Sequence, residues 1–98
     1  MEWPRPFRPI DRPESRSAFE AELRRELKPG HPLYGVPVGA SGARYDQDDV
    51  LFELLDGSGR VAEVHLTWKG ERESPPWPGT ALFDTFAAWA ESVRQDYT

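Results

Sequence analysis

The chain has 98 residues, a net charge of −5, a hydrophobic content of 38% and no cysteine. This length predicts one domain, and the absence of cysteine excludes disulfides and thiolate chemistry. The negative charge argues against a nucleic-acid partner, because such proteins need basic side chains to neutralise phosphates. The sequence contains neither an apolar run of the roughly 20 residues that a membrane helix needs nor the apolar core of a secretory signal. We therefore expect a soluble, cytoplasmic protein without membrane contact.

Residues 1–13 are predicted to form an extended, proline-rich N-terminal arm, followed by a single α+β domain over residues 14–98. Prolines at positions 4, 6, 9 and 13 fix φ and bias each preceding residue toward extended geometry. The spacing Pro6-x-x-Pro9 with flanking arginines resembles a ligand for aromatic-lined grooves. An arm packed on its own domain through Trp3, Phe7 and Ile10, or a disordered arm, is the simpler expectation.

The first regular element is predicted to be a helix that ends near Lys28. Ser17 and Glu20 have the spacing of a capping box, which marks a helix start. An apolar stripe at i, i+4 and i+8 follows, made of Phe19, Leu23 and Leu27. We expect the charged face of this helix to be solvated and Pro29-Gly30 to end it.

Residues 36–45 favour a strand that lies at an edge at its start, because Pro37 fits poorly in a central strand, and the glycines at 39 and 42 predict a bulge or bend. The stretch 48–68 then predicts a β-hairpin that turns at Asp56–Gly59. Its best register pairs Phe52 with Ala62 and Asp49 with His65. The buried face would consist of Val50, Phe52, Leu54, Ala62, Val64, Leu66 and Trp68. The other face would carry Leu51, Glu53, Glu63, His65 and Thr67.

A proline-punctuated loop is predicted over residues 69–80, with Trp77 inside it. Thr85 is a suitable N-cap for a final helix over residues 86–96, whose apolar positions are Phe86, Trp89, Ala90, Val93 and Tyr97. The expected fold is therefore α+β, in the order α-β-β-β-α: a three-stranded antiparallel β-meander with an N-terminal and a C-terminal helix packed on one face. The half-polar second face would then meet solvent or a partner.

Four short motifs occur in this order: His-Pro-Leu-Tyr-Gly at 31–35, Asp-Val-Leu-Phe at 49–52, His-Leu-Thr-Trp at 65–68 and Trp-Pro-Gly-Thr at 77–80. Together they resemble a family of small bacterial proteins without an assigned function. The resemblance covers about residues 31–90. It implies an α+β fold and carries no activity, cofactor or partner with it.

The strongest candidates for chemistry are His65 and Asp49, which the preferred register places side by side. Such a pair can fix a histidine tautomer and serve general acid–base catalysis. The sequence has no nucleophile at a recognisable elbow, and a plain cross-strand polar pair is the simpler interpretation. The two histidines and the aspartates at 46, 48 and 49 lack metal-ligand spacing. We expect no metal and no cofactor.

The composition leaves several functions open, with a non-enzymatic interaction module as the first. The small size, the acidic body and aromatics set among prolines favour a module that binds another protein through Trp77, Glu63, His65 and Glu53. An immunity or antitoxin-like protein that binds a basic toxin is one version. The alternatives are a small-molecule-binding protein or enzyme that uses His65 with Asp49, and a homodimer formed through an open sheet face or edge.

Overall fold

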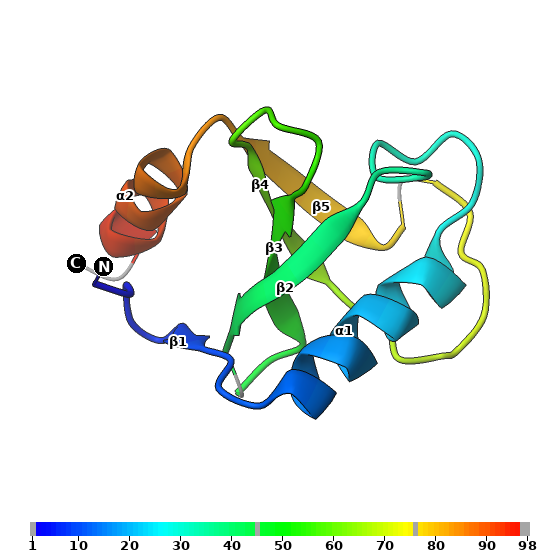
Figure 1. Ribbon diagram of the computed structural model, residues 1–98, viewed down its shortest axis with the longest axis horizontal. Coiled ribbons are helices and arrows are strands. Elements are labelled where there is room, and N and C mark those ends of the chain that lie inside the picture. The colour runs from blue at the N-terminus through cyan, green and yellow to red at the C-terminus, as the bar shows by residue number, and fades with distance from the viewer. Residues whose placement is uncertain (1, 45, 76, 97–98) are drawn as a thin grey trace.

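The computed structural model describes residues 2–44, 46–75 and 77–96 and is shown in Figure 1. Within these residues the chain forms β1 (Arg8–Pro9), α1 (Pro13–Glu26), β2 (Val38–Ala43), β3 (Asp49–Leu54), β4 (Val61–His65), β5 (Gly79–Phe83) and α2 (Phe86–Asp96). The strands make one antiparallel sheet in the order β1-β2-β3-β4-β5. The α+β class and the meander are confirmed.

The predicted number of three strands is wrong, because the sheet has five. The additional strand β1 is two residues long, which is too short to show an alternating pattern, and it pairs with β2 from within the predicted arm. The strand β5 begins inside the segment predicted as a loop. Its Gly-Thr-Ala-Leu-Phe sequence follows a run of prolines and lacks a polar–apolar alternation, so the local signals pointed to a loop.

The register of the central hairpin is confirmed. Asp49 pairs with His65 and Phe52 pairs with Ala62. Six of the seven residues predicted for the buried face are buried, namely Val50, Phe52, Leu54, Ala62, Val64 and Leu66. Trp68 is the exception, since it remains 43% exposed. The strand β4 ends at His65 and Trp68 has a φ of 58°, so the alternation no longer applies at this position.

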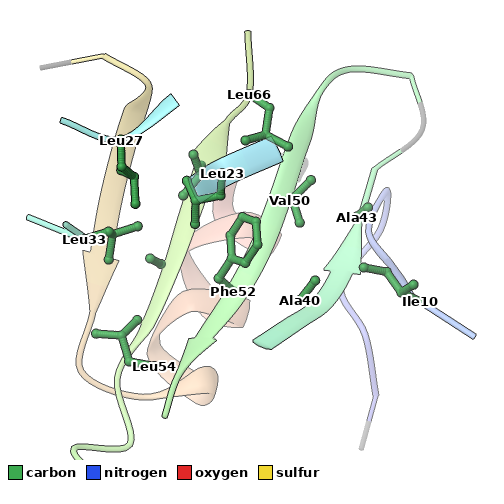
Figure 2. Packing of buried hydrophobic residues seen from close by; sticks show 12 residues of the cluster. Ile10, Leu23, Leu27, Leu33, Ala40, Ala43, Val50, Phe52, Leu54 and Leu66 are labelled. Carbon is green, nitrogen blue, oxygen red and sulfur yellow. The ribbon is translucent and has the colours of Figure 1, made fainter. Parts of the chain in front are cut away.

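The two helices lie on opposite faces of the sheet, and the prediction that both pack on one face is wrong. On one face, Leu23 and Leu27 of α1 join Ile10, Leu33 and the inward residues of β2, β3 and β4 in one cluster. Figure 2 looks onto this face, with α2 behind the sheet. On the other face, Trp89 and Val93 of α2 pack with Phe7, Leu51 and Val61. Leu51 and Val61 alternate with the first set, so the second face also has apolar surface to bury.

The two helices begin with different start signals, a proline in α1 and a capping threonine before α2. The first helix begins at Pro13, the last residue of the predicted arm, so the predicted capping box at Ser17 is wrong. Proline at the first helical position is preorganised for a helix start. The last helix has the predicted bounds, and the Thr85 hydroxyl accepts the N–H of Ala88 at 3.0 Å. Tyr97, predicted for its apolar face, lies outside the described residues.

The N-terminal segment is packed onto the sheet in the described structure. Phe7 and Ile10 are buried, in the α2 and α1 clusters respectively. The Trp3 ring lies on Gly42, where any Cβ would overlap it. The predicted bulge is confirmed between Ala40 and Gly42. Neither described helix is long and apolar enough to cross a membrane.

Candidate functional site

Most of the candidate side chains lie on the side of the sheet that α2 packs against, which we call the α2 face. Side chains alternate between the two faces along a strand. Because Leu51 and Val61 contact α2 residues, the alternation places Asp49 and Glu53 of β3 and Glu63 and His65 of β4 on this face. The helix covers the apolar centre of the face, and the polar residues surround that centre.

Asp49 and His65 form a close pair at one end of the α2 face. The His65 Nδ1 lies 2.6 Å from Oδ1 of Asp49. The histidine side chain is 55% exposed and the aspartate side chain 13%. A carboxylate at Nδ1 favours a proton on that nitrogen, which leaves Nε2 as the free base of a neutral ring. In the described part of the chain, Nε2 has no hydrogen-bond partner.

Glu63 lies next to this pair and links it to α2. Its Oε1 accepts the indole N–H of Trp89 at 2.8 Å. Burial raises the pKa of the Glu63 carboxyl, and this effect outweighs the lowering by the Trp89 hydrogen bond. The negative charges of Asp49 and Asp96 add to the rise, while Arg44 opposes it. Burial is thus the main cause of the raised pKa, and the nearby carboxylates add to it.

Arg44 is the basic residue of this region, and it already has partners. Its guanidinium donates to both carboxylate oxygens of Asp46, at 2.9 and 2.8 Å, and lies 5.9 Å from the centre of the Phe7 ring. Among the described residues, the ion pair of Arg44 is with Asp46, and that of Asp49 is with His65. The charge of the acidic side chains is the main electrostatic property of the site.

Trp77 joins the same end of the α2 face. Its side chain is 56% exposed, and its ring lies 3.6 Å from the position that a Cβ on Gly79 would occupy. Gly79 is the register partner of His65, so a Cβ at that position would point to the α2 face. The fold thus gathers Trp77, His65, Asp49 and Glu63, which the sequence had singled out from three separate segments.

Glu53 is not part of this group, because it lies at the opposite end of β3. It accepts the Ser41 hydroxyl at 3.1 Å and borders a mainly apolar cavity of about 310 Å³ that is also lined by Trp3, Leu51 and Phe86. His65 does not line this cavity. No cluster of three His, Asp or Glu side chains in residues 2–44, 46–75 and 77–96 is arranged to hold a metal ion.

Two buried carboxyls on α1 were missed by sequence reasoning. Glu22 and Glu26 are buried, although the charged face of this helix was predicted to be solvated. Glu26 accepts the backbone N–H groups of Thr67 and Trp68 at 3.0 Å, and Glu22 accepts that of Gly70 at 3.2 Å. Their positions beside Leu23 and Leu27 in the sequence, at a spacing of four, were the available signal.

The carboxyls of Glu22 and Glu26 interact with each other, and their pKa values move in opposite directions. Burial raises the pKa of Glu26 to about 7, and Glu22 adds to the rise. Burial also raises the pKa of Glu22, but hydrogen bonds from Glu26, Gly70 and Arg25 outweigh it, so the pKa of Glu22 lies below its ordinary value. The protonated member is therefore Glu26, and together they hold the connection between β4 and β5.

His31 holds the other end of that connection. Its Nδ1 accepts the N–H of Leu33 at 3.0 Å, which leaves the proton on Nε2, 3.0 Å from the carbonyl oxygen of Pro78. Two of the four sequence motifs, at 31–35 and 77–80, are thus joined by a structural contact. His31 is buried and is not a surface binding residue.

Replacing His31 with alanine is expected to lower the free energy of unfolding by about 2 kcal/mol, because the Pro78 carbonyl loses a donor and a small void forms. Urea denaturation followed by circular dichroism measures this. His65→Ala, at an exposed position, is the matched control and should change the free energy by less than about 1 kcal/mol. Equal losses in the two variants would contradict the assignment of His31 as the structural histidine.

Comparisons of the chain with protein-family models, with curated proteins and with solved structures find no match. The function is therefore argued from the geometry of the described residues.

Proposed function

We propose that this protein is a non-enzymatic interaction module that binds another protein by adding a strand to the β5 edge, with Trp77 as an anchor. The observation that carries the proposal is the unprotected state of this edge. The described sheet ends at β5, which is the pale orange strand at the left margin in Figure 2. Residues 79–83 contain no charged residue and no proline. Such an edge is a template for a further strand.

The opposite edge of the sheet has the usual protection. The strand β1 has only two residues, one of them Pro9 and the other Arg8. Short length, proline and charge are the features that prevent edge-to-edge pairing. The contrast between the two edges supports a role for β5 in binding rather than a general lack of edge protection.

Two exposed apolar side chains flank the β5 edge. Trp77 precedes the strand on the α2 face, and Leu82, which is 40% exposed, pairs with Ala62 and so lies on the α1 face. Exposed tryptophans in particular are frequent anchors of protein interfaces. A strand added here would meet an apolar side chain on each face.

Catalysis by His65 with Asp49 is the weaker candidate function. The pair can hold a free imidazole nitrogen, but the cavity of about 310 Å³ lies at the other end of the α2 face. The motif resemblance, which is to small bacterial proteins without an assigned function, does not favour either role.

Affinity capture with the purified protein as bait tests the interaction role. A specific partner should be retained by the wild type and lost by at least about tenfold in Leu82→Lys and in Trp77→Ala, because the first charges the edge and the second removes the anchor. Leu55→Lys is the matched control, since Leu55 is also exposed but lies beyond the hairpin strands. A partner retained equally by all variants would refute binding at β5.

A further inference from the structure

We infer that the segment added at β5 is an extended strand with arginine or lysine at alternate positions, whose basic side chains cross Ala81 to reach Glu63 and lie against the ring of Trp77. This inference rests on the proposed function and names the chemistry of its partner. The other positions of the segment, on the α1 face, carry apolar side chains that pack against Leu82. The three observations that support it are the small residues of β5, the acidic groups behind them and the position of Trp77.

The small residues of β5 open a path from the edge to β4. Gly79 pairs with His65 and Ala81 pairs with Glu63, so both small residues lie on the α2 face. The Trp77 ring covers Gly79, whereas Ala81 is exposed and lies directly in front of Glu63. Neighbouring strands are about 4.8 Å apart, and long side chains reach beyond the directly opposite residue. An arginine or lysine on the added strand can therefore extend over Ala81 toward the Glu63 carboxylate.

The groups behind β5 favour a cation. Glu63 faces this path, and Asp49 on β3 and Asp96 on α2 add negative charge behind it. The basic residue of the region, Arg44, is engaged by Asp46 and Phe7. Burial and the neighbouring carboxylates raise the pKa of Glu63, so an incoming positive charge would relieve a repulsion that is already present.

Trp77 provides a second contact for the same side chains. Its ring lies against Gly79 at the start of β5, and it is exposed. An arginine over the face of a tryptophan gains cation–π attraction. Trp77 and the acidic site therefore both favour a basic residue on the added strand.

A second copy of this chain fits the edge less well. The strand β5 carries no basic residue, and each copy brings a net charge of −5. Pairing of two β5 strands would place two acidic sites near one another without a compensating cation. Charge complementarity therefore favours a basic partner over a homodimer.

Three eight-residue peptides serve as probes: one alternating arginine with valine, one alternating glutamate with valine, and one alternating arginine with serine. Each is titrated into the full ¹⁵N-labelled protein, and affinity is taken from amide shifts. We expect the arginine–valine peptide to bind with shifts at residues 79–83, and the glutamate–valine peptide not to bind. The arginine–serine peptide should bind more weakly, because it lacks apolar side chains for Leu82.

Variants of the protein test the acidic site. In Asp49→Asn combined with Glu63→Gln, the affinity for the arginine–valine peptide should fall by about tenfold or more. In the control Glu71→Gln it should not fall.

Each contrary outcome identifies what fails. Equal weakening in Glu71→Gln, or shifts spread over the surface, would reduce the binding to unspecific charge attraction and overturn the inference. Sedimentation that shows a dimer lost in Leu82→Lys would assign the edge to a second copy, which refutes the basic partner but keeps β5 as an interface. Absence of peptide shifts at β5, together with unchanged partner capture in the edge variants, would refute the proposed function itself.

Discussion

Replacing Glu26 with alanine is expected to lower the free energy of unfolding by about 3–5 kcal/mol. The side chain is fully buried and accepts the backbone N–H groups of Thr67 and Trp68. Removing it leaves these partly buried donors without their carboxylate partner. One of them belongs to Trp68, whose positive φ is unfavourable for a non-glycine residue and needs surrounding contacts to persist.

Urea denaturation of Glu26→Ala measures this effect. The matched control is Glu14→Ala on the same helix, where the side chain is exposed, and the expected change is within about 1 kcal/mol. Glu26→Gln should lower the free energy of unfolding by an intermediate amount. Its amide oxygen can still accept backbone N–H groups, but its amide nitrogen cannot accept them and cannot take up a proton beside Glu22. An effect of Glu26→Ala no larger than that of Glu14→Ala would contradict the anchoring role.

The raised pKa of Glu26 makes the free energy of unfolding depend on pH near neutrality. The folded protein keeps the Glu26 proton up to about pH 7, whereas the ordinary pKa is 4.5. Between these values the folded state binds more protons than the unfolded state, so the free energy of unfolding falls as pH rises from about 4.5 to 7. The contribution of Glu22, with its lowered pKa, is present above about pH 4.5 and is lost at lower pH.

The charged groups around the two carboxyls limit the size of this pH effect. Arg25 on α1 pairs with Glu22, and Lys69 pairs with Glu73 on the loop. We expect the fall between pH 4.5 and 7 to be on the order of 2–3 kcal/mol, since a tenfold change in proton affinity corresponds to about 1.4 kcal/mol. Glu26→Gln should flatten this part of the profile, and a wild-type profile equally flat would show that the proton is not held.

Replacing Trp89 with alanine is expected to cost about 3–5 kcal/mol, the range for the loss of a large buried aromatic side chain. Trp89 is completely buried and packs against the rings of Trp3, Phe7 and Phe86, with ring centres 4.9 to 5.8 Å away. It is the centre of the cluster that fixes α2 on the sheet, so its loss removes the packing between two elements.

Trp89→Phe separates the hydrogen bond from the packing. It keeps most of the ring but removes the donor to Glu63, and we expect a cost of about 1–3 kcal/mol because the half-buried carboxylate loses its partner. Circular dichroism in urea measures both variants, since tryptophan fluorescence changes with the substitution. The exposed Trp77→Ala is the control and should cost less than about 1 kcal/mol. A cost for Trp89→Ala as small as that would contradict the central role of Trp89.

The parts of the fold that were predictable are those fixed by local periodicity. The alternation around Phe52 and Val64 and the glycine turn determined the hairpin register, and Thr85 marked the start of α2. The side of the sheet that α2 covers was not predictable, since it depends on Leu51 and Val61 as members of a cluster with Phe7 from a distant segment. The strand β5 lacks an alternating pattern and becomes a strand through pairing with β4.

The candidate site was predictable to a similar degree. The register alone brought Asp49 to His65, but the positions of Trp77 and Glu63 required the path of β5 and the contact with Trp89. The burial of Glu22 and Glu26 was not predictable, because carboxylates on a helix are mostly solvated. Their burial results from a loop more than 40 residues away that supplies the N–H donors.

The two ties of the loop between β4 and β5 have a consequence for how the chain folds. Strands that follow one another in the chain also lie side by side in the sheet, so most pairing requires only short loop closures. The ties from Glu26 to Thr67 and from His31 to Pro78 instead join residues 41 and 47 positions apart. Contacts between such distant residues carry a larger entropic cost of closure. The sheet can therefore form first. The loop that carries Trp77 then docks last during folding and detaches first during unfolding.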